Sequence, residues 1–147
     1  LAKPVWLLDL HRYLGALTLA AVATHLGALV ADSFVPFGIA DLLVPGASAW
    51  RTVPAFWGVV AFWLFVAVEV SSLARRRLPN RVWARIHMLS FVAYVLATVH
   101  YLQAGTERTN ALLLLVVEVT SAVVVFLTVL RVLTPRKRPR VQVAQAR

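Results

Sequence analysis

Histidine is the residue type in this sequence best suited to binding a metal, and it occurs at four positions. These are His11, His25, His87 and His100, and the sequence contains no cysteine. Without cysteine, this chain can build no thiolate metal site, iron–sulfur cluster, covalently attached c-type haem or disulfide. Any metal chemistry in the chain must therefore depend on histidine or carboxylate side chains.

The histidines belong to a sequence with the composition of a membrane protein. Of its 147 residues, 61% are hydrophobic and 14% are charged, whereas a soluble domain is typically about half apolar and about a quarter charged. The net charge of +9 might suggest nucleic-acid binding, but the basic residues form short runs beside long apolar segments. We therefore expect the lipid bilayer as a partner and no nucleic acid.

Four apolar segments are long enough to cross a hydrocarbon layer of ~30 Å, which takes about 20 helical residues. They are residues 5–31, 55–75, 81–104 and 110–133. Prolines and glycines interrupt the connection between the first two, and its apolar piece at 39–44 is expected to lie on the membrane surface. The predicted fold is all-α, an integral membrane four-helix bundle over residues 1–134 that is part of a larger transmembrane bundle.

The distribution of basic residues predicts the topology. Thirteen of the 15 lie near the start of the first helix, in the turn between the second and third helices, or from the end of the fourth helix onward. By the positive-inside rule, these regions face the cytoplasm, including a basic tail at 135–147. We expect a multi-pass protein of the cell (plasma) membrane in which the first and third helices run in the same direction. Because residue 1 is Leu, we also expect the chain to begin inside a larger membrane domain.

All four histidines fall in those two parallel helices. His11 and His25 are 14 residues apart, which corresponds to about 21 Å along a helix and an angular offset of about 40°. Both rings can therefore face the same neighbour. Since the first and third helices are parallel, His11 is expected at the depth of His87, and His25 at the depth of His100.

Two imidazoles at one depth on facing helices provide the two axial ligands of a six-coordinate haem iron. The pattern predicts two b haems and electron transfer across the membrane. One alternative is a protein in which the same histidines bind or transport a bare metal ion. Another is a structural anchor whose histidines only form interhelical hydrogen bonds. Transport would favour a polar path between the two depths, but residues 17–23 and 93–99 are almost wholly apolar.

The sequence around the histidines resembles the ferric reductase-like transmembrane domain. The segments are LHRYLG at 10–15, THL at 24–26, IHMLS at 86–90 and VHYLQAGT at 99–106. This family is shared by ferric reductases, the membrane half of NADPH oxidases and bacterial haem-binding subunits of methionine sulfoxide reductases. The resemblance covers about residues 9–106 and implies bis-histidine haem b, with His11 paired to His87 and His25 to His100.

The chain has no recognisable flavin- or nicotinamide-binding segment of its own. We therefore expect an electron-transfer oxidoreductase subunit that receives electrons from a donor protein or a quinol on the cytoplasmic side. Gly15, on the same face as His11, either admits the edge of a haem or allows tight helix packing. Arg12 and Arg108 are candidate partners of haem propionates, and for Arg12 a snorkelling topology charge is the favoured alternative.

Three further side chains inside the predicted helices have polar groups that need an explanation. Glu69 and Glu118 are carboxylates well inside the membrane, where charge is costly. They invite a proton-transfer or quinone-site hypothesis, but a neutral glutamic acid hydrogen-bonded between helices would explain them without any function. Trp63 is the aromatic residue most suited to line a haem pocket.

The spacing on the third helix raises a geometric question. His87 and His100 are 13 residues apart, so an ideal helix places them about 140° apart around its axis. If both rings face the first helix, the sequence predicts a change of winding between them, such as a π-bulge or a 3₁₀ stretch. If the helix stays regular, the two haems are expected at different azimuths.

Overall fold

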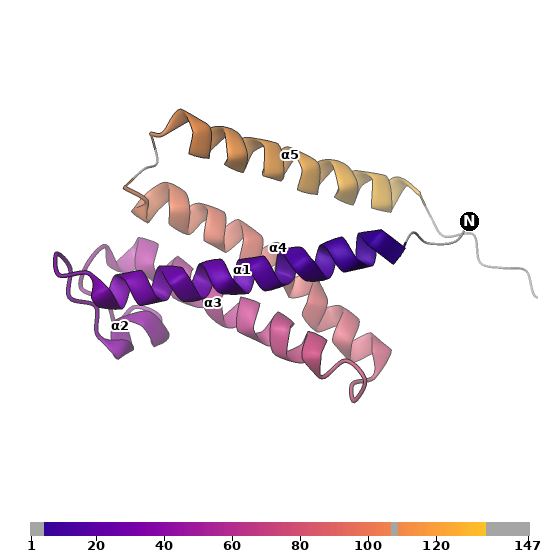
Figure 1. Cartoon of the computed structure of the whole chain (residues 1–147), viewed down its shortest axis with the longest axis horizontal. Coiled ribbons are helices and arrows are strands. Elements are labelled where there is room, and N and C mark those ends of the chain that lie inside the picture. Colours follow the sequence, from indigo (N-terminus) through magenta and orange to yellow (C-terminus); the bar gives the residue numbers. More distant parts are fainter. Residues whose placement is uncertain (1–4, 107–108, 135–147) are drawn as a thin grey trace, which may run out of the picture. The chain divides into compact units, whose positions relative to one another are not determined.

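The computed structural model describes residues 5–106 and 109–134, which form five α-helices (Figure 1). Four of them are long and apolar enough to cross a membrane: α1 (Val5–Ala31), α3 (Thr52–Leu73), α4 (Asn80–Ala104) and α5 (Ala111–Leu133). The predicted all-α class and the four predicted long apolar helices are therefore confirmed. Only α3 departs from its predicted bounds by more than one residue, since it runs over 52–73 rather than 55–75.

The chain divides into two compact units, Leu1–Gly105 and Thr106–Arg147. The second unit contains α5, whose first turn is capped by Asn110. The Asn110 side-chain oxygen accepts hydrogen bonds from the backbone N–H groups of Leu112 and Leu113, at 3.0 and 3.4 Å, and so satisfies donors that have no partner within the helix. Glu118 lies on α5, and the predicted tail at 135–147 lies outside the described residues.

In the first unit, α3 and α4 pack against each other as an antiparallel pair. Small and β-branched side chains form the buried contact, among them Val59, Ala61 and Val68 of α3 and Ala93 of α4. Small residues let two helix backbones approach closely, which is how helices commonly associate in lipid, where there is little hydrophobic driving force. The α3–α4 pair is the closely packed part of this unit.

Helix α1 is positioned differently, because none of its residues is buried. Its half-buried residues are Gly15, Val22, Leu26 and Leu29, and these share one face because they are separated by seven, four and three positions. Most of the exposed side chains of α1 are apolar, as expected of a helix that faces lipid, and the charged pair Asp9 and Arg12 lies near its start. One face of α1 is therefore turned toward the rest of the unit.

The connection from α1 to α3 contains a short helix, α2 (Ile39–Leu43). It is held to α3 by the indole N–H of Trp63, which donates to the backbone oxygen of Leu43 at 2.8 Å. Within the same connection, the rings of Phe37 and Trp50 meet edge to face at 5.9 Å. The connection thus folds back onto the end of the unit where α1 finishes and α3 begins (Figure 1).

Candidate functional site

The four histidines meet in two pairs, each with one ring from α1 and one from α4. The ring centroids of His11 and His87 are 5.9 Å apart, with an angle of 81° between their planes. Those of His25 and His100 are 6.3 Å apart, with an angle of 74°. Since the earlier histidines of the two helices meet each other, and the later ones likewise, α1 and α4 run in the same direction. The structure therefore brings together the pairs that the sequence predicts to share a depth.

The prediction that α4 must change its winding to achieve this is wrong. Helix α4 is a single unbroken α-helix over Asn80–Ala104, yet both His87 and His100 reach rings on α1. The reason is that the two helices cross (Figure 1), so α1 lies on one side of α4 toward the start of α4 and on the other side toward its end. The direction from α4 to α1 rotates along the helix, which compensates for the angular offset of about 140° between the two side chains.

The separation of the rings is informative about a shared ligand. Two imidazoles that bind one metal ion from opposite sides have centroids roughly 6 Å apart, because each metal–nitrogen bond is about 2 Å and each nitrogen lies about 1 Å from its ring centre. The observed separations of 5.9 and 6.3 Å match this value. The same separations are also those of a direct edge-to-face contact between two rings, so the spacing alone does not distinguish a metal-binding pair from two rings in contact.

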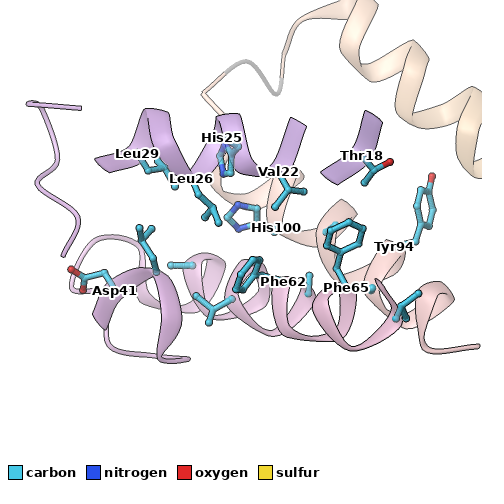
Figure 2. Close-up of a pocket in the computed structure, with 18 of the residues that line it drawn as sticks. Thr18, Val22, His25, Leu26, Leu29, Asp41, Phe62, Phe65, Tyr94 and His100 are labelled. Carbon is cyan, nitrogen blue, oxygen red and sulfur yellow. The ribbon is translucent and has the colours of Figure 1, made fainter. Parts of the chain in front are cut away.

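An apolar cavity of about 430 Å³ adjoins the His25–His100 pair. In Figure 2, Val22 and Leu26 point from α1 toward α3, and Phe62 and Phe65 point from α3 toward α1. Other lining residues include Ala93 and Ala97 of α4, and Asp41 and Leu42 of α2. The segment expected on the membrane surface thus helps to line the cavity. Trp63, suggested from sequence as a lining residue, is not among the lining residues and is 46% exposed.

His100 is held by the first turns of α3. Its Nδ1 lies 2.8 Å from the backbone oxygen of Pro54, and since a carbonyl only accepts hydrogen bonds, Nδ1 carries the proton. In the neutral ring, Nε2 then keeps a free electron pair, the form in which histidine binds metals. Gly58, one turn after Pro54, lies directly against the ring, because a Cβ built there would be 2.7 Å from Nδ1.

His87 is held by stacking instead. The indole of Trp83, one turn earlier on α4, lies against it with ring centroids 4.9 Å apart and an angle of 18° between the planes. The guanidinium of Arg75 covers the indole at 4.1 Å. Among the described residues, nothing accepts a hydrogen bond from the buried Nδ1 of His87. His87 therefore lacks, at Nδ1, the hydrogen-bond partner that His100 has at the same atom.

The remaining candidate residues surround the His11–His87 pair less closely. Arg12 forms an ion pair with Asp9 at 3.5 Å, and its side chain is 69% exposed. A Cβ added at Gly15 would meet Glu69 Oε1 at 3.8 Å, an ordinary contact, so tight packing does not require glycine there. Glu69 thus lies on the α1 side of α3. Arg108 lies outside the described residues.

The contacts of Pro54, Gly58 and Trp83 were not predicted from the sequence. Trp83 gave a detectable signal, since it precedes His87 by four residues and so lies on the same helical face. Pro54 and Gly58 gave none, because they are more than 40 positions from His100 in the chain. Only the antiparallel pairing of α3 and α4 brings these two residues to His100.

The number of ligands distinguishes the kinds of metal centre that each pair can form. Within residues 5–106 and 109–134, no group of three or more His, Asp or Glu side chains is placed to hold a metal ion. Protein sites for bare zinc commonly use three or four protein ligands. A haem brings four equatorial nitrogens of its own and takes axial ligands from the protein, so two histidines can complete it.

Comparison with known proteins gave one match. The family described as "Ferric reductase like transmembrane component" matches residues 3–98. This match includes His11, His25 and His87, and it ends two residues before His100. No curated protein and no solved structure gives a significant match.

Proposed function

Because the chain belongs to the ferric reductase-like transmembrane family, we propose that it passes electrons across a membrane through two b haems, each held by one histidine pair. The observation that carries this proposal is that one histidine of α1 meets one of α4 at each of two levels, with ring centroids 5.9 Å apart for His11 and His87 and 6.3 Å apart for His25 and His100. Each separation suits one iron with an axial imidazole on either side. A bound haem supplies one-electron chemistry at its iron, and the four histidines supply the axial nitrogens.

The surroundings of the His25–His100 pair favour a haem over a bare ion. A haem needs an apolar space for its macrocycle, and the cavity beside this pair is lined almost entirely by aliphatic and aromatic side chains. A bare ion needs additional ligands instead. Phe62 and Phe65 would keep water away from a macrocycle in this cavity, and the bond from Nδ1 of His100 to the Pro54 oxygen keeps Nε2 available.

The separation of the two levels suits transfer across a bilayer. His11 and His25 are 14 residues apart, which is about 21 Å along α1, compared with ~30 Å for the hydrocarbon layer. One haem would therefore lie in each half of the membrane. The apolar residues between the two levels leave no polar path for an ion, which favours movement of electrons over movement of metal.

The direction of transfer follows from the charges. Arg75, Arg76 and Arg77 lie in the α3–α4 turn, at the end of the unit nearer His87. We assign this end to the cytoplasm by the positive-inside rule, so that the donor, a protein or a quinol, reduces the haem of the His11–His87 pair. A reporter fused in the α3–α4 turn or after Arg147 should lie in the cytoplasm, and one in 32–51 outside. Opposite sidedness of the turn and the tail would contradict the four-span topology.

The decisive experiment is a visible absorption spectrum of the purified chain, combined with haem and metal analysis. We expect sharp b-type bands that intensify on addition of dithionite, and two haems per chain by the pyridine haemochrome method. A colourless protein that contains zinc or copper would support the alternative of a histidine-based metal-ion protein. A chain that contains neither haem nor metal would point to a structural role for the histidines.

A further inference from the structure

We propose that the first two turns of α3 form a seat for His100, in which the Pro54 oxygen holds Nδ1 and Gly58 provides the space for the ring. The inference rests on the proposed function, because it treats His100 as an axial ligand. It adds Gly58 as a positioning residue of the His25–His100 level. It also gives the backbone carbonyl of Pro54 a role in orienting His100, which no sequence pattern indicates.

The hydrogen bond does two things for the ring. At 2.8 Å from the Pro54 oxygen, Nδ1 is the donor, and this selects the neutral form in which Nε2 can bind a metal. The bond also restricts rotation of the ring about its side-chain bonds. Ligating histidines usually donate their second ring nitrogen to a carboxylate, a backbone carbonyl or water, and these partners orient the ring toward the metal.

Gly58 is required by the position of the ring. A Cβ at this residue would lie 2.7 Å from Nδ1, 2.8 Å from Cε1 and 3.1 Å from Cγ of His100. These contacts are too short, and they fall across the ring rather than on a flexible tip. The ring would have to move away, which would break its bond to Pro54 or shift Nε2 from its place beside the cavity. A methyl group and the observed ring position are therefore incompatible.

The presence of glycine here also runs against helix preference. Gly58 lies inside α3, where glycine is less favourable than alanine because it loses more backbone entropy on folding. Its φ is in the ordinary helical range, so backbone conformation does not require glycine. The space needed by His100 gives a physical reason for glycine at this position.

The seat affects one level only, and this makes it testable. Gly27 of α1 provides a matched control. A Cβ at Gly27, two residues from His25, would meet nothing within 4 Å. The Gly58→Ala and Gly27→Ala variants therefore introduce the same methyl group with different expected results.

The first measurement is the haem content of the intact chain, with a redox titration of the haem bands. We expect Gly58→Ala to retain about one haem per chain and to lose the redox component that His100→Ala also loses. Gly27→Ala should retain both haems. The haem that remains in Gly58→Ala should keep its wild-type spectrum and potential, which a general folding defect would not allow.

The second measurement is thermal unfolding in detergent, with Gly58→Ala placed in two backgrounds. With His100 present, we expect the methyl group to lower the unfolding midpoint or to prevent the chain from accumulating. In the His100→Ala background the collision is gone, so Gly58→Ala should restore accumulation and raise the midpoint slightly, because alanine favours the helix. The effect of Gly58→Ala on the unfolding midpoint should thus have opposite signs in the two backgrounds, which tests the contact between residue 58 and the His100 ring.

The outcomes separate this inference from the proposed function. If wild type and Gly27→Ala carry two haems and Gly58→Ala does too, the seat is wrong while the proposed function stands. The seat would also be overturned if Gly58→Ala lowered the unfolding midpoint in the His100→Ala background as much as it does with His100 present. If wild type binds no haem, the proposed function fails, and the inference about ligation fails with it.

Discussion

The two histidine pairs have nearly the same ring separation, but their α4 histidines are held in different ways. His100 is fixed by a hydrogen bond from Nδ1 to the backbone oxygen of Pro54, a residue of the neighbouring helix α3. His87 is fixed by the stacked ring of Trp83, a residue of its own helix. A hydrogen bond defines a direction in the ring plane, whereas stacking defines the plane but leaves rotation within it less restricted.

This difference has consequences for how each pair receives a ligand. The His25–His100 pair is preorganised, because its tautomer is set and it adjoins a formed cavity. The His11–His87 pair has an orphaned nitrogen at His87 Nδ1, and such a group is costly when buried. We therefore expect the His25–His100 level to bind its haem more tightly, and the His11–His87 level to depend on its stacked aromatic.

The largest expected effect comes from removing the ligands themselves. Replacing His25 or His100 by alanine should abolish the same haem, and replacing His11 or His87 should abolish the other. Each single variant should keep about one haem per chain, measured by pyridine haemochrome and redox titration. The assignment of one haem to each histidine pair is contradicted if the His11→Ala/His25→Ala double variant still holds two six-coordinate haems.

The next largest effect is expected from a bulky side chain in the cavity, which should weaken haem retention at the His25–His100 level only. Ala97 lines the cavity, so Ala97→Phe should occupy part of the space expected for a macrocycle. Overpacking typically costs about 1–3 kcal/mol, which corresponds to roughly fivefold to 150-fold weaker retention of the haem. The effect is measured as the rate at which haem transfers to added apomyoglobin. The transfer is followed at the absorption bands that are missing from the His100→Ala variant. Ala67→Phe on the exposed side of α3 is the control and should leave retention unchanged.

Removing the stacked ring should weaken the other level. Trp83→Leu eliminates the parallel contact with His87, and aromatic pairs contribute about 0.5–1.5 kcal/mol beyond simple burial. We expect haem loss from the His11–His87 level to accelerate roughly twofold to tenfold, with the His25–His100 level unaffected. Trp83→Phe preserves an aromatic ring, so its rate of haem loss should lie between those of the wild type and Trp83→Leu. Equal acceleration at both levels would show that Trp83 supports the fold as a whole.

The smallest effect is expected at the outer member of the stack. The Arg75 guanidinium lies over Trp83 and also donates to the Asn80 side-chain oxygen at 3.0 Å. A cation–π contact at an exposed site contributes about 0.5–1 kcal/mol, so Arg75→Gln should accelerate haem loss from the His11–His87 level by about fivefold at most. The same substitution in a Trp83→Leu background should have less effect, because the contact is already absent. Additive effects would instead indicate that Arg75 acts independently of the stack.

Much of the fold could be predicted because membrane spans are encoded locally. A segment that crosses hydrocarbon must be apolar over about 20 residues and must satisfy its own backbone hydrogen bonds, which only a helix achieves with a single segment. The bounds of α1, α4 and α5 could therefore be read almost directly. The start of α3 was placed three residues late, because Pro54 and Thr52 resemble loop residues although proline is well tolerated in a first helical turn.

The sequence by itself determined the four helices and the two levels at which histidines meet, because both follow from residue counts along helices of fixed rise. The tertiary structure alone decided how the rings reach one another. The crossing of α1 and α4 lets a regular helix present His87 and His100 to the same neighbour, and the pairing of α3 with α4 places Pro54 and Gly58 beside His100. These features depend on the relative placement of whole helices, which side-chain packing sets and which no local spacing specifies.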